Sequence, residues 1–561
     1  MNNSSGHVVQ SAELLLSSEL GRFCESELLT EEGLREIIQR HGLAHDEHLS
    51  DYYFFRAACS NRRVTEEMIQ CLLEYFPDAA STTDDHGWKP LHIACWNKNV
   101  TPNIIQLLLD AAPASVRSVT NVTDGGWTPL HYLCSNDKVD EGNAIQILKL
   151  LIEKYPEAAR HATYGQGRLP IHRAAAGRSP EFCRELIEAY PGSERINDAN
   201  GLLPLHCACT RNTLPTVEYF YKLYPAAIHR VTTGDYPSGG YYPIHKAISF
   251  IAHRDDPSAA VYNVKFLLDC DPNQILIQFE GRPLLEFACR QLYNHSNIGA
   301  ALEVIKILFD AHPEAIEDNA IVRGLALTHP IQRYNQQVRS FINRELVYAR
   351  KAKNHRLMMT PDKHGQLPLH KALQNNATLG SIKLLTKANP HAVQSPDNIG
   401  ALPLHVACQH HDSVNVIQYL IGLDPSSLDA VDRNGNTALH YACLGAKHDT
   451  IALLLEKYDA VSVSKRNAEN KLPIELLWES DAVKDEESAE YTDCVFRLLK
   501  AYPETLRNVG TVEQQALTAC SGRNGNGKKS SLLVFIRKAM RSSMKRVQNI
   551  RKPASASDGL P

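Results

Sequence analysis

A nine-residue pattern that recurs along the chain limits the possible folds more than any other feature. It begins with Gly, continues as Pro-Leu-His or a close variant, and usually ends in Ala-Cys or Ala-Ala. One copy, GLLPLHCAC from Gly201, would on its own suggest a metal site or an activated thiol. The histidine of the pattern occurs at His92, His131, His172, His206, His245, His370, His405 and His440. Such regular recurrence predicts repeated structural units instead of one reactive centre.

Further copies of the pattern carry another residue at the histidine position. These residues are Arg56, Glu286 and Glu475. The interval between Glu286 and His370 is 84 residues, which is about two periods, and Gly324 with His329 can mark an eroded unit inside it. The sequence therefore predicts eleven or twelve units.

A second motif follows each copy and predicts a longer helix. Examples are LLEYFPDAA at 72–80 and LIEKYPEAA at 151–159, in which apolar residues at helical spacing precede a proline. Proline lacks an N–H and disfavours helix in the residue before it, so it should end that helix. Asp-x-x-Gly sequences then suit a type I turn, as in Asp198–Gly201 and Asp432–Gly435. Each unit is predicted to contain a polar turn, a short helix that opens at Pro-Leu-His, a loop and a longer helix.

The Gly-x-x-Pro-Leu-His-x-Ala core, with two helices and a turn per unit, resembles the ankyrin repeat. The resemblance covers residues 51–510 and implies an all-α solenoid of about 11–12 helix-turn-helix repeats. It also implies a scaffold that binds proteins and has no catalysis of its own. The threonine that precedes the family's Pro-Leu-His survives only at Thr128 and, before Ala438, at Thr437. We therefore expect the histidines of most other units to bond to backbone or solvent.

The resemblance divides the chain into three parts. Residues 1–50 form an N-terminal segment that we expect to be partly disordered, with a capping helix between Thr30 and Gly42. Residues 51–510 form the array, with a degenerate unit near 320–355. Residues 511–561 form a basic tail with an amphipathic helix. Because each repeat buries its face only against its neighbours, the array should not divide into independent domains.

Charge and composition limit the classes of partner and the cellular compartment that we expect for this protein. The net charge is −4, yet residues 521–561 hold ten Lys or Arg and one acidic residue, which leaves −13 on the rest of the chain. An acidic body makes nucleic acid an unexpected partner. The 14 cysteines lack the dense spacing of a secreted disulfide scaffold, and no secretory leader or transmembrane segment is evident. We expect an intracellular protein of the cytoplasm or nucleus.

No stretch of the sequence predicts a catalytic, metal or cofactor site. Seven cysteines share one register, in which Ala175 stands elsewhere, so they are interpreted as small buried residues. Zinc needs about four ligands, commonly in paired motifs that are absent here. The segment 522–530 imitates a phosphate-binding loop, but Lys529 stands where a magnesium-binding Ser or Thr should be. The chain is therefore predicted not to be an enzyme.

The resemblance also indicates where a partner would bind. Ankyrin repeats make variable contacts through turn tips, through the residue after the glycine and through residues just beyond His-x-Ala-Cys. Trp, Tyr and Arg at such positions are typical of binding hot spots. The candidate residues are Trp88, Trp96, Trp127, Arg168, Arg211 and Tyr241. Alternatively, Trp88 and Trp127 serve only to pack against neighbouring turns.

A second functional hypothesis rests on residues 531–552. Their apolar residues recur at broadly helical spacing and are flanked by Arg537, Lys538, Arg541, Lys545 and Arg546. Such a helix can target an acidic membrane surface or a calmodulin-like protein, or it can cover the exposed core of the last repeat. The favoured function is a scaffold or adaptor that binds a protein through the concave face. The alternative is a regulator that the tail directs to its target.

Overall fold

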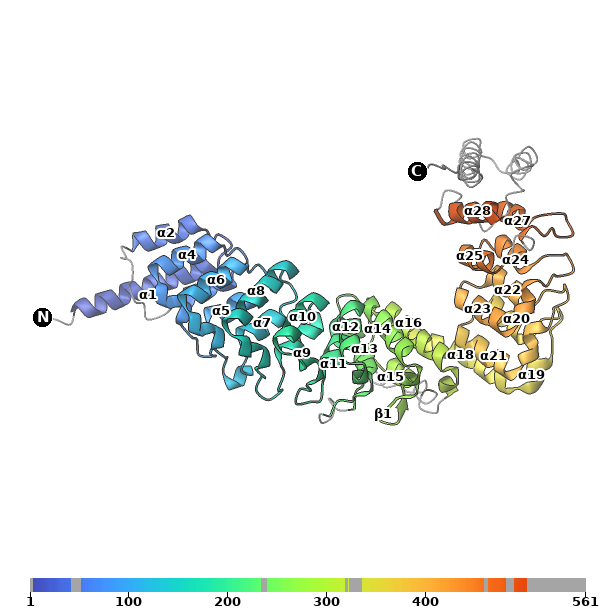
Figure 1. The fold of residues 1–561 in the computed structure, drawn as a ribbon, viewed down its shortest axis with the longest axis horizontal. Helices are drawn as coiled ribbons and strands as arrows, with labels where there is room; N and C mark the ends of the chain where they lie inside the picture. Colours follow the sequence, from blue (N-terminus) through green and yellow to red (C-terminus); the bar gives the residue numbers. More distant parts are fainter. Residues whose placement is uncertain are drawn as a thin grey trace, which may run out of the picture. The chain divides into compact units, whose positions relative to one another are not determined.

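The prediction of an all-α repeat solenoid is confirmed by a computed structural model. The structure describes residues 4–41, 52–233, 240–317, 321, 335–458, 463–480 and 489–501. Successive pairs of antiparallel helices make up most of these residues, and Figure 1 shows them stacked side by side within each part of the chain. The only strands in these ranges are β1 (Gln278–Phe279) and β2 (Arg282–Pro283), which pair antiparallel as a short hairpin.

The first helix of each pair is short and opens at the recurrent motif. Proline occupies its first turn in most units, where the missing N–H would have had no partner in the helix. These first helices are α3 (Tyr53–Ser60), α5 (Pro90–Trp96), α7 (Pro129–Ser135), α9 (Pro170–Gly177), α11 (Pro204–Arg211), α13 (Pro243–Ser249), α15 (Leu284–Cys289), α20 (Pro368–Gln374), α22 (Pro403–His410), α24 (Ala438–Leu444) and α27 (Pro473–Glu479).

The second helix of each pair is amphipathic and often begins at a capping side chain. Thr65, Thr101 and Ser179, for example, each accept a hydrogen bond from the backbone amide three residues later. The second helices are α4 (Glu66–Tyr75), α6 (Pro102–Ala111), α8 (Glu141–Lys154), α10 (Pro180–Ala189), α12 (Leu214–Leu223), α14 (Ser258–Cys270), α16 (Ile298–Ala311), α21 (Leu379–Ala388), α23 (Val414–Leu423), α25 (His448–Lys457) and α28 (Ala489–Ala501).

The proline after the second helix does more than end it. In most units it opens a 3₁₀ turn, as in Pro77–Ser81, Pro156–Arg160 and Pro390–Gln394. In Pro77–Ser81 and Pro156–Arg160, both alanines of the turn are buried. The segment predicted as a polar turn therefore begins with a 3₁₀ turn that buries small apolar side chains, and the polar Asp-x-x-Gly sequence follows it. Further 3₁₀ turns are Pro113–Arg117, Val122–Asp124, Ser193–Arg195, Pro225–His229, Ile251–His253, Pro272–Leu276, Pro313–Glu317 and Pro425–Leu428.

The chain divides into two compact units, Met1–Ile307 with Thr328–Asn335, and Leu308–Leu327 with Gln336–Pro561. In the first unit, the first helices from α3 to α15 pack in sequence, and the second helices form a parallel row. Helices α1 (Ser4–Glu25) and α2 (Glu31–Arg40) pack on α3 and α4, as an additional pair would. Thr30 caps α2 by accepting from Gly33 N.

The second unit repeats this arrangement from α20 to α28. The long helix α18 (Gln336–Lys353) packs on α21, and the short α19 (His355–Met359) follows it. Helix α18 lies in the segment near 320–355 for which a degenerate repeat is predicted, and α19 begins at the end of that segment. Gly324 and His329, which suggested the start of that repeat, are outside the described residues.

Candidate functional site

The motif histidine connects its own helix to the next turn. Its Nδ1 accepts the backbone N–H of the residue that precedes the helix, at 3.0 Å from Lys89 to His92 and 3.2 Å from Leu203 to His206. In His206, the other ring nitrogen, Nε2, lies 3.1 Å from the carbonyl oxygen of Arg230 in the following turn. The same Nδ1 contact occurs at all eight motif histidines, so backbone replaces the threonine in most units as expected.

Burial keeps these imidazoles neutral. Desolvation lowers the pKa of His206 to about 4 and that of His131 to about 3. Only Thr128 and Thr437 add a hydroxyl contact to the histidine, at 2.8 and 2.9 Å. The His206 ring uses both nitrogens to hold backbone groups, which agrees with the interpretation of GLLPLHCAC as a helix start.

The cysteines of the motif are also packing residues, because they are buried in the interior. Cys95, Cys209, Cys408 and their counterparts are buried, and burial raises the pKa of Cys209 to about 12. A thiol with this pKa forms little thiolate at neutral pH and is a poor nucleophile. Within the described ranges, no three His, Cys, Asp or Glu residues are grouped so that they could hold a metal ion.

A row of polar side chains joins neighbouring units and was missed by the sequence analysis. Each donates to a carbonyl at the end of the preceding first helix. Asn61 donates to Cys24 O at 2.7 Å, Asn97 to Cys59 O at 2.9 Å, Asn136 to Cys95 O at 3.2 Å and Asn212 to Ala175 O at 3.0 Å. In the second unit, His411 Nε2 makes a similar contact, at 2.7 Å, with the carbonyl of Ala377 in the loop after α20. The signal was present as Cys-x-Asn at 59–61, 95–97 and 134–136. These bonds satisfy carbonyls that a helix end leaves without partners.

All three candidate tryptophans pack around one residue of the first unit, Tyr132. Trp88, Trp127 and Trp96 lie with their ring centres 4.4, 5.0 and 6.1 Å from that of Tyr132. We call these four residues the aromatic cluster. Tyr132 is buried, Trp88 and Trp127 are partly exposed, and Trp96 is 51% exposed. Tyr132 was not among the residues predicted to bind a partner. Its position directly after the motif histidine His131 could have identified it as a neighbour of the tryptophans.

Two register positions produce these contacts. The post-glycine residue follows the motif Gly, and the post-histidine residue follows the motif His or Glu. In the first unit, the post-glycine residues from the second copy on are Trp88, Trp127, Arg168, Leu202, Tyr241 and Arg282. The corresponding post-histidine residues are Ile93, Tyr132, Arg173, Cys207, Lys246 and Phe287. Stacked units bring the two series together, since Tyr132 meets Trp88 and Arg173 meets Trp127 of the unit before.

The remaining candidates occupy the same surface in different ways. Arg168 pairs with Asp198 through Nε and Oδ2 at 3.0 Å. Tyr241 stacks on Phe279 with ring centres 4.5 Å apart, about as closely as the cluster's rings meet. Arg211 is exposed and lies in a groove with Trp96. The structure thus joins Trp88, Trp96 and Trp127 directly, and Arg211 to them through the groove.

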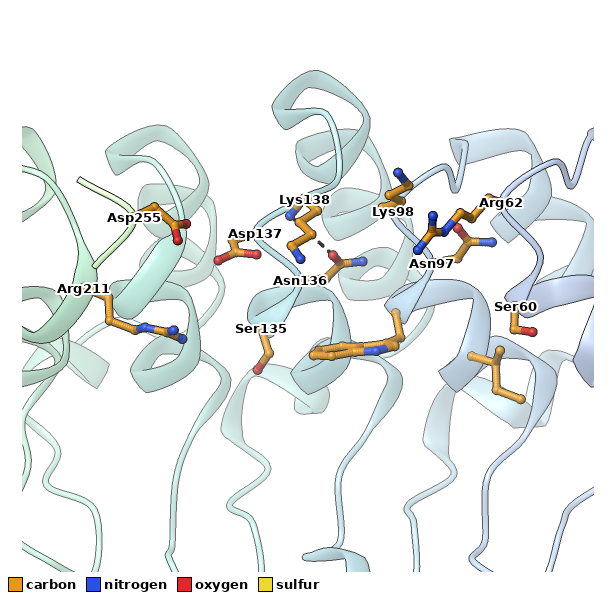
Figure 2. Close-up of a pocket in the computed structure, with 12 residues that line it drawn as sticks. Ser60, Arg62, Asn97, Lys98, Ser135, Asn136, Asp137, Lys138, Arg211 and Asp255 are labelled. Atoms are coloured by element: carbon orange, nitrogen blue, oxygen red, sulfur yellow. Dashed lines mark hydrogen bonds between the residues drawn. The ribbon is translucent and has the colours of Figure 1, made fainter. Parts of the chain in front are cut away.

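That groove runs along the loops that follow the first helices of several units. It has a volume of about 490 Å³ and is lined by Trp96 together with the polar side chains that Figure 2 labels. Arg62, Lys98, Lys138 and Arg211 supply four cations, whereas Asp137 and Asp255 supply two carboxylates. No ion pair involves these four cations within the described part of the chain. We call this feature the loop groove.

The candidate residues of the tail, Arg537, Lys538, Arg541, Lys545 and Arg546, lie outside the described residues. The role of the tail as a membrane or calmodulin-directed segment therefore stays a prediction. Among the helices that the structure describes, none combines the length and the apolar character that a membrane span requires.

Comparison with known proteins identifies the repeats. A family model described as ankyrin repeats (3 copies) matches residues 54–161, 138–230 and 369–467. No curated protein matches the chain. The matched segments contain most of the helix pairs described above, including the aromatic cluster. The chain thus contains ankyrin repeats in both of its units.

Proposed function

We propose that this protein is a scaffold or adaptor that binds a protein partner through the concave face of its first unit. Ankyrin repeats are generally modules of protein–protein interaction, and proteins built from them are typically non-enzymatic. The concave face is taken here as the surface of post-glycine and post-histidine residues with the adjoining loop groove. We propose that the protein acts inside the cell, in the cytoplasm or nucleus, because each of the thirteen described cysteines is free.

The convergence of the tryptophans on Tyr132 carries this proposal. Aromatic side chains dominate binding hot spots because they combine a large apolar area with little conformational freedom. Trp96 supports it most, because it is 51% exposed and lines the loop groove. The packing of Trp88 and Trp127 on Tyr132 fixes Trp96 from one side, so the cluster is preorganised for a ligand.

The charge of the loop groove favours an acidic segment of the partner. Its four cations outnumber its two carboxylates, on a body that is otherwise acidic. A segment of the partner with an apolar residue for Trp96 and acidic residues beside it would complement this surface.

A photo-cross-linking residue placed at Ser135, which lines the groove, tests the proposal. The full chain carrying it is irradiated in an extract of the source cells, and the same residue at Tyr262 is the control, since Tyr262 is 59% exposed on α14. We expect a discrete adduct from Ser135 that Trp96→Ala and Arg211→Ala each reduce at least tenfold. Equal adducts from both positions, or no effect of either substitution in a folded chain, would contradict the proposal.

A further inference from the structure

Arginines and tyrosines alternate along one edge of the first unit. Each arginine is the fourth residue after the proline that opens a 3₁₀ turn, and each tyrosine directly precedes that proline in the next repeat. The guanidinium carbons of Arg117, Arg160 and Arg195 lie 5.4, 5.0 and 5.3 Å from the ring centres of Tyr155, Tyr190 and Tyr224, respectively. We call these six residues the Arg–Tyr ladder.

The ladder links four consecutive repeats. Each tyrosine is the C-terminal cap of its second helix, α8, α10 or α12. Each arginine ends the 3₁₀ turn of the repeat before. Because every contact crosses from one repeat to the next, the three arginines form one row at the spacing of the repeats. The loop groove follows the first helices, so the ladder occupies the opposite edge of these antiparallel helix pairs.

The arginines keep hydrogen-bond donors for a ligand. A cation–π contact uses the flat face of the guanidinium and leaves the N–H groups in its plane free. Arg117 is exposed and has neither a hydrogen bond nor an ion pair within the described ranges. Arg160 Nε lies 3.9 Å from Glu157 Oε2, and both side chains are more than half exposed, so this ion pair contributes little.

The third arginine is bound through only one of its nitrogens. Arg195 Nε donates to Glu194 Oε1 at 3.1 Å, and the side chain of Arg195 is 63% exposed. Its terminal nitrogens have no acceptor in the part of the chain that the structure describes. The Tyr224 ring limits the freedom of this side chain before a ligand arrives, which lowers the entropy lost on binding.

The described turns of the second unit lack this pairing. The prolines that open them, Pro313, Pro390 and Pro425, are preceded by His312, Asn389 and Asp424 and followed four residues later by Glu317, Gln394 and Asp429. The 3₁₀ turn therefore forms without arginine or tyrosine at these positions. The ladder is an addition to the repeat in the first unit, and the fold of the turn does not require it.

The spacing of the ladder fits one kind of extended segment. Packed helices lie about 10 Å apart, which sets the order of the distance between neighbouring arginines. A polyproline II segment rises about 3.1 Å per residue with three residues per turn, so every third side chain returns to the same side after about 9 Å. An α-helix reaches about 10 Å only at every seventh residue and would need about fifteen residues to meet three arginines.

We propose that the Arg–Tyr ladder binds an extended acidic segment of a second protein, with Asp or Glu at every third position and a polyproline II backbone. Each carboxylate accepts N–H groups from one arginine, which gives charge-assisted hydrogen bonds. The intervening residues contact the partly exposed tyrosine rings, as polyproline II segments do in aromatic-lined sites. This surface goes beyond the proposed function, and it does not depend on the loop groove.

The test measures binding of two labelled peptides to the full-length chain by fluorescence anisotropy at constant ionic strength. The spaced peptide is Glu-Pro-Ala-Glu-Pro-Ala-Glu-Pro-Ala-Glu. The clustered peptide, Pro-Ala-Pro-Glu-Glu-Glu-Glu-Ala-Pro-Ala, has the same composition and charge. A single-stranded oligouridylate of the same length is the third probe.

Four variants accompany the wild-type chain. Arg160→Met removes the central cation of the ladder, and Tyr190→Leu removes the ring that holds it. Arg160→Lys keeps the charge without the planar fork of donors. Arg433→Met removes an exposed arginine from a turn of the second unit and is the charge-matched control. Circular dichroism, with hydrogen exchange in α8 and α10, shows whether each variant is folded.

We expect the wild-type chain and Arg433→Met to bind the spaced peptide at least about fivefold more tightly than the clustered one. Arg160→Met should lose this preference because the middle contact is missing. Tyr190→Leu should bind the spaced peptide at least about threefold more weakly, although its charge is unchanged. Should Tyr190→Leu not fold, Arg160→Lys is expected to show the same weakening.

Three results would overturn the inference. Equal binding of the two peptides would mean that the ladder does not recognise the spacing of the carboxylates. An unchanged preference in folded Arg160→Met would place the binding elsewhere. Tighter binding of the oligouridylate than of the spaced peptide would assign the surface to nucleic acid. No variant here changes the loop groove, so the Ser135 cross-link tests the proposed function separately.

Discussion

The two units hold the post-histidine side chains of their repeats with different partners. In the second unit, the post-histidine residues Lys371 and Tyr441 are each bound by the turn aspartate of their own repeat, Asp362 and Asp432, at 2.9 Å. In the first unit, Lys246 and Tyr132 follow turns that have threonine at that place and contact aromatic rings instead. One side chain in the turn therefore decides whether the surface satisfies itself or stays available to a partner.

The post-glycine residues reinforce this contrast. In the second unit they are Gln366, Ala401, Asn436 and Lys471. The first unit has Trp88, Trp127 and Tyr241 among these positions. Large aromatic residues at a surface cost solubility unless they are used, so their restriction to one unit points to the binding face.

Acidification should produce the largest difference between the units. The first unit contains five motif histidines, and burial lowers the pKa to about 4 for His92, His172 and His206 and to about 3 for His131 and His245. The second unit contains His370, His405 and His440, whose pKa values burial also lowers. The ordinary value in an unfolded chain is about 6.5.

Since the folded pKa lies below the unfolded one, the unfolded chain binds more protons between these values, and stability falls as the pH drops below about 6.5. Each buried histidine can contribute up to about 1.4 kcal/mol per pH unit in this window. We expect the first unit to lose protection first when hydrogen exchange is followed from pH 7 to pH 4.5. Earlier loss in α20–α25 would contradict the assignment.

Removal of a turn aspartate should have the next largest effect on stability. The loss of stability should be larger in the second unit than in the first. Asp432 accepts the backbone N–H groups of Asn434 and Asn436, the Asn436 amide and the Tyr441 hydroxyl. Asp432→Ala leaves the buried Tyr441 hydroxyl and the partly buried donors of Asn436 without their acceptor, and we expect the free energy of unfolding to fall by about 3 kcal/mol.

Asp84 of the first unit is the matched control. It accepts the N–H groups of His86 and Trp88, and no post-histidine side chain is bonded to it in the described residues. Asp84→Ala should cost about 1 kcal/mol. Exchange rates in α24 and α5 measure the two effects, and equal losses would remove the distinction between the units.

The smallest effect on stability is expected from substitution of the two post-histidine lysines, Lys371 and Lys246. Lys371→Met removes a partly exposed ion pair and should cost no more than about 0.5 kcal/mol. Lys246→Met removes a buried cation without a counterion in the described residues, so it should leave stability unchanged or raise it by about 1 kcal/mol. Unfolding in urea, followed separately for each unit by hydrogen exchange, gives the comparison. A larger loss from Lys246→Met would mean that its ammonium has a stabilising role.

The sequence predicted the helices well because their signals are local. Pro90 and Pro129 start helices as expected, and the motif histidines bond to backbone as expected. The 3₁₀ turns after proline and the bonds of Asn97 and Asn136 were not predicted. A 3₁₀ turn has no periodic pattern of its own, and the asparagine bonds join residues about 40 positions apart, so no local window contains both partners.

The sequence by itself determined the repeat, its two helices and the neutral packing role of GLLPLHCAC, because a motif that recurs in one register carries its own structural context. The tertiary structure decided which candidates belong together. Trp88 meets Tyr132 only because one repeat is stacked on the next. Among the described residues Lys246 has no carboxylate partner, whereas Lys371 at the same register is paired with Asp362. Contacts between side chains of successive units depend on that stacking, and no spacing within one repeat encodes it.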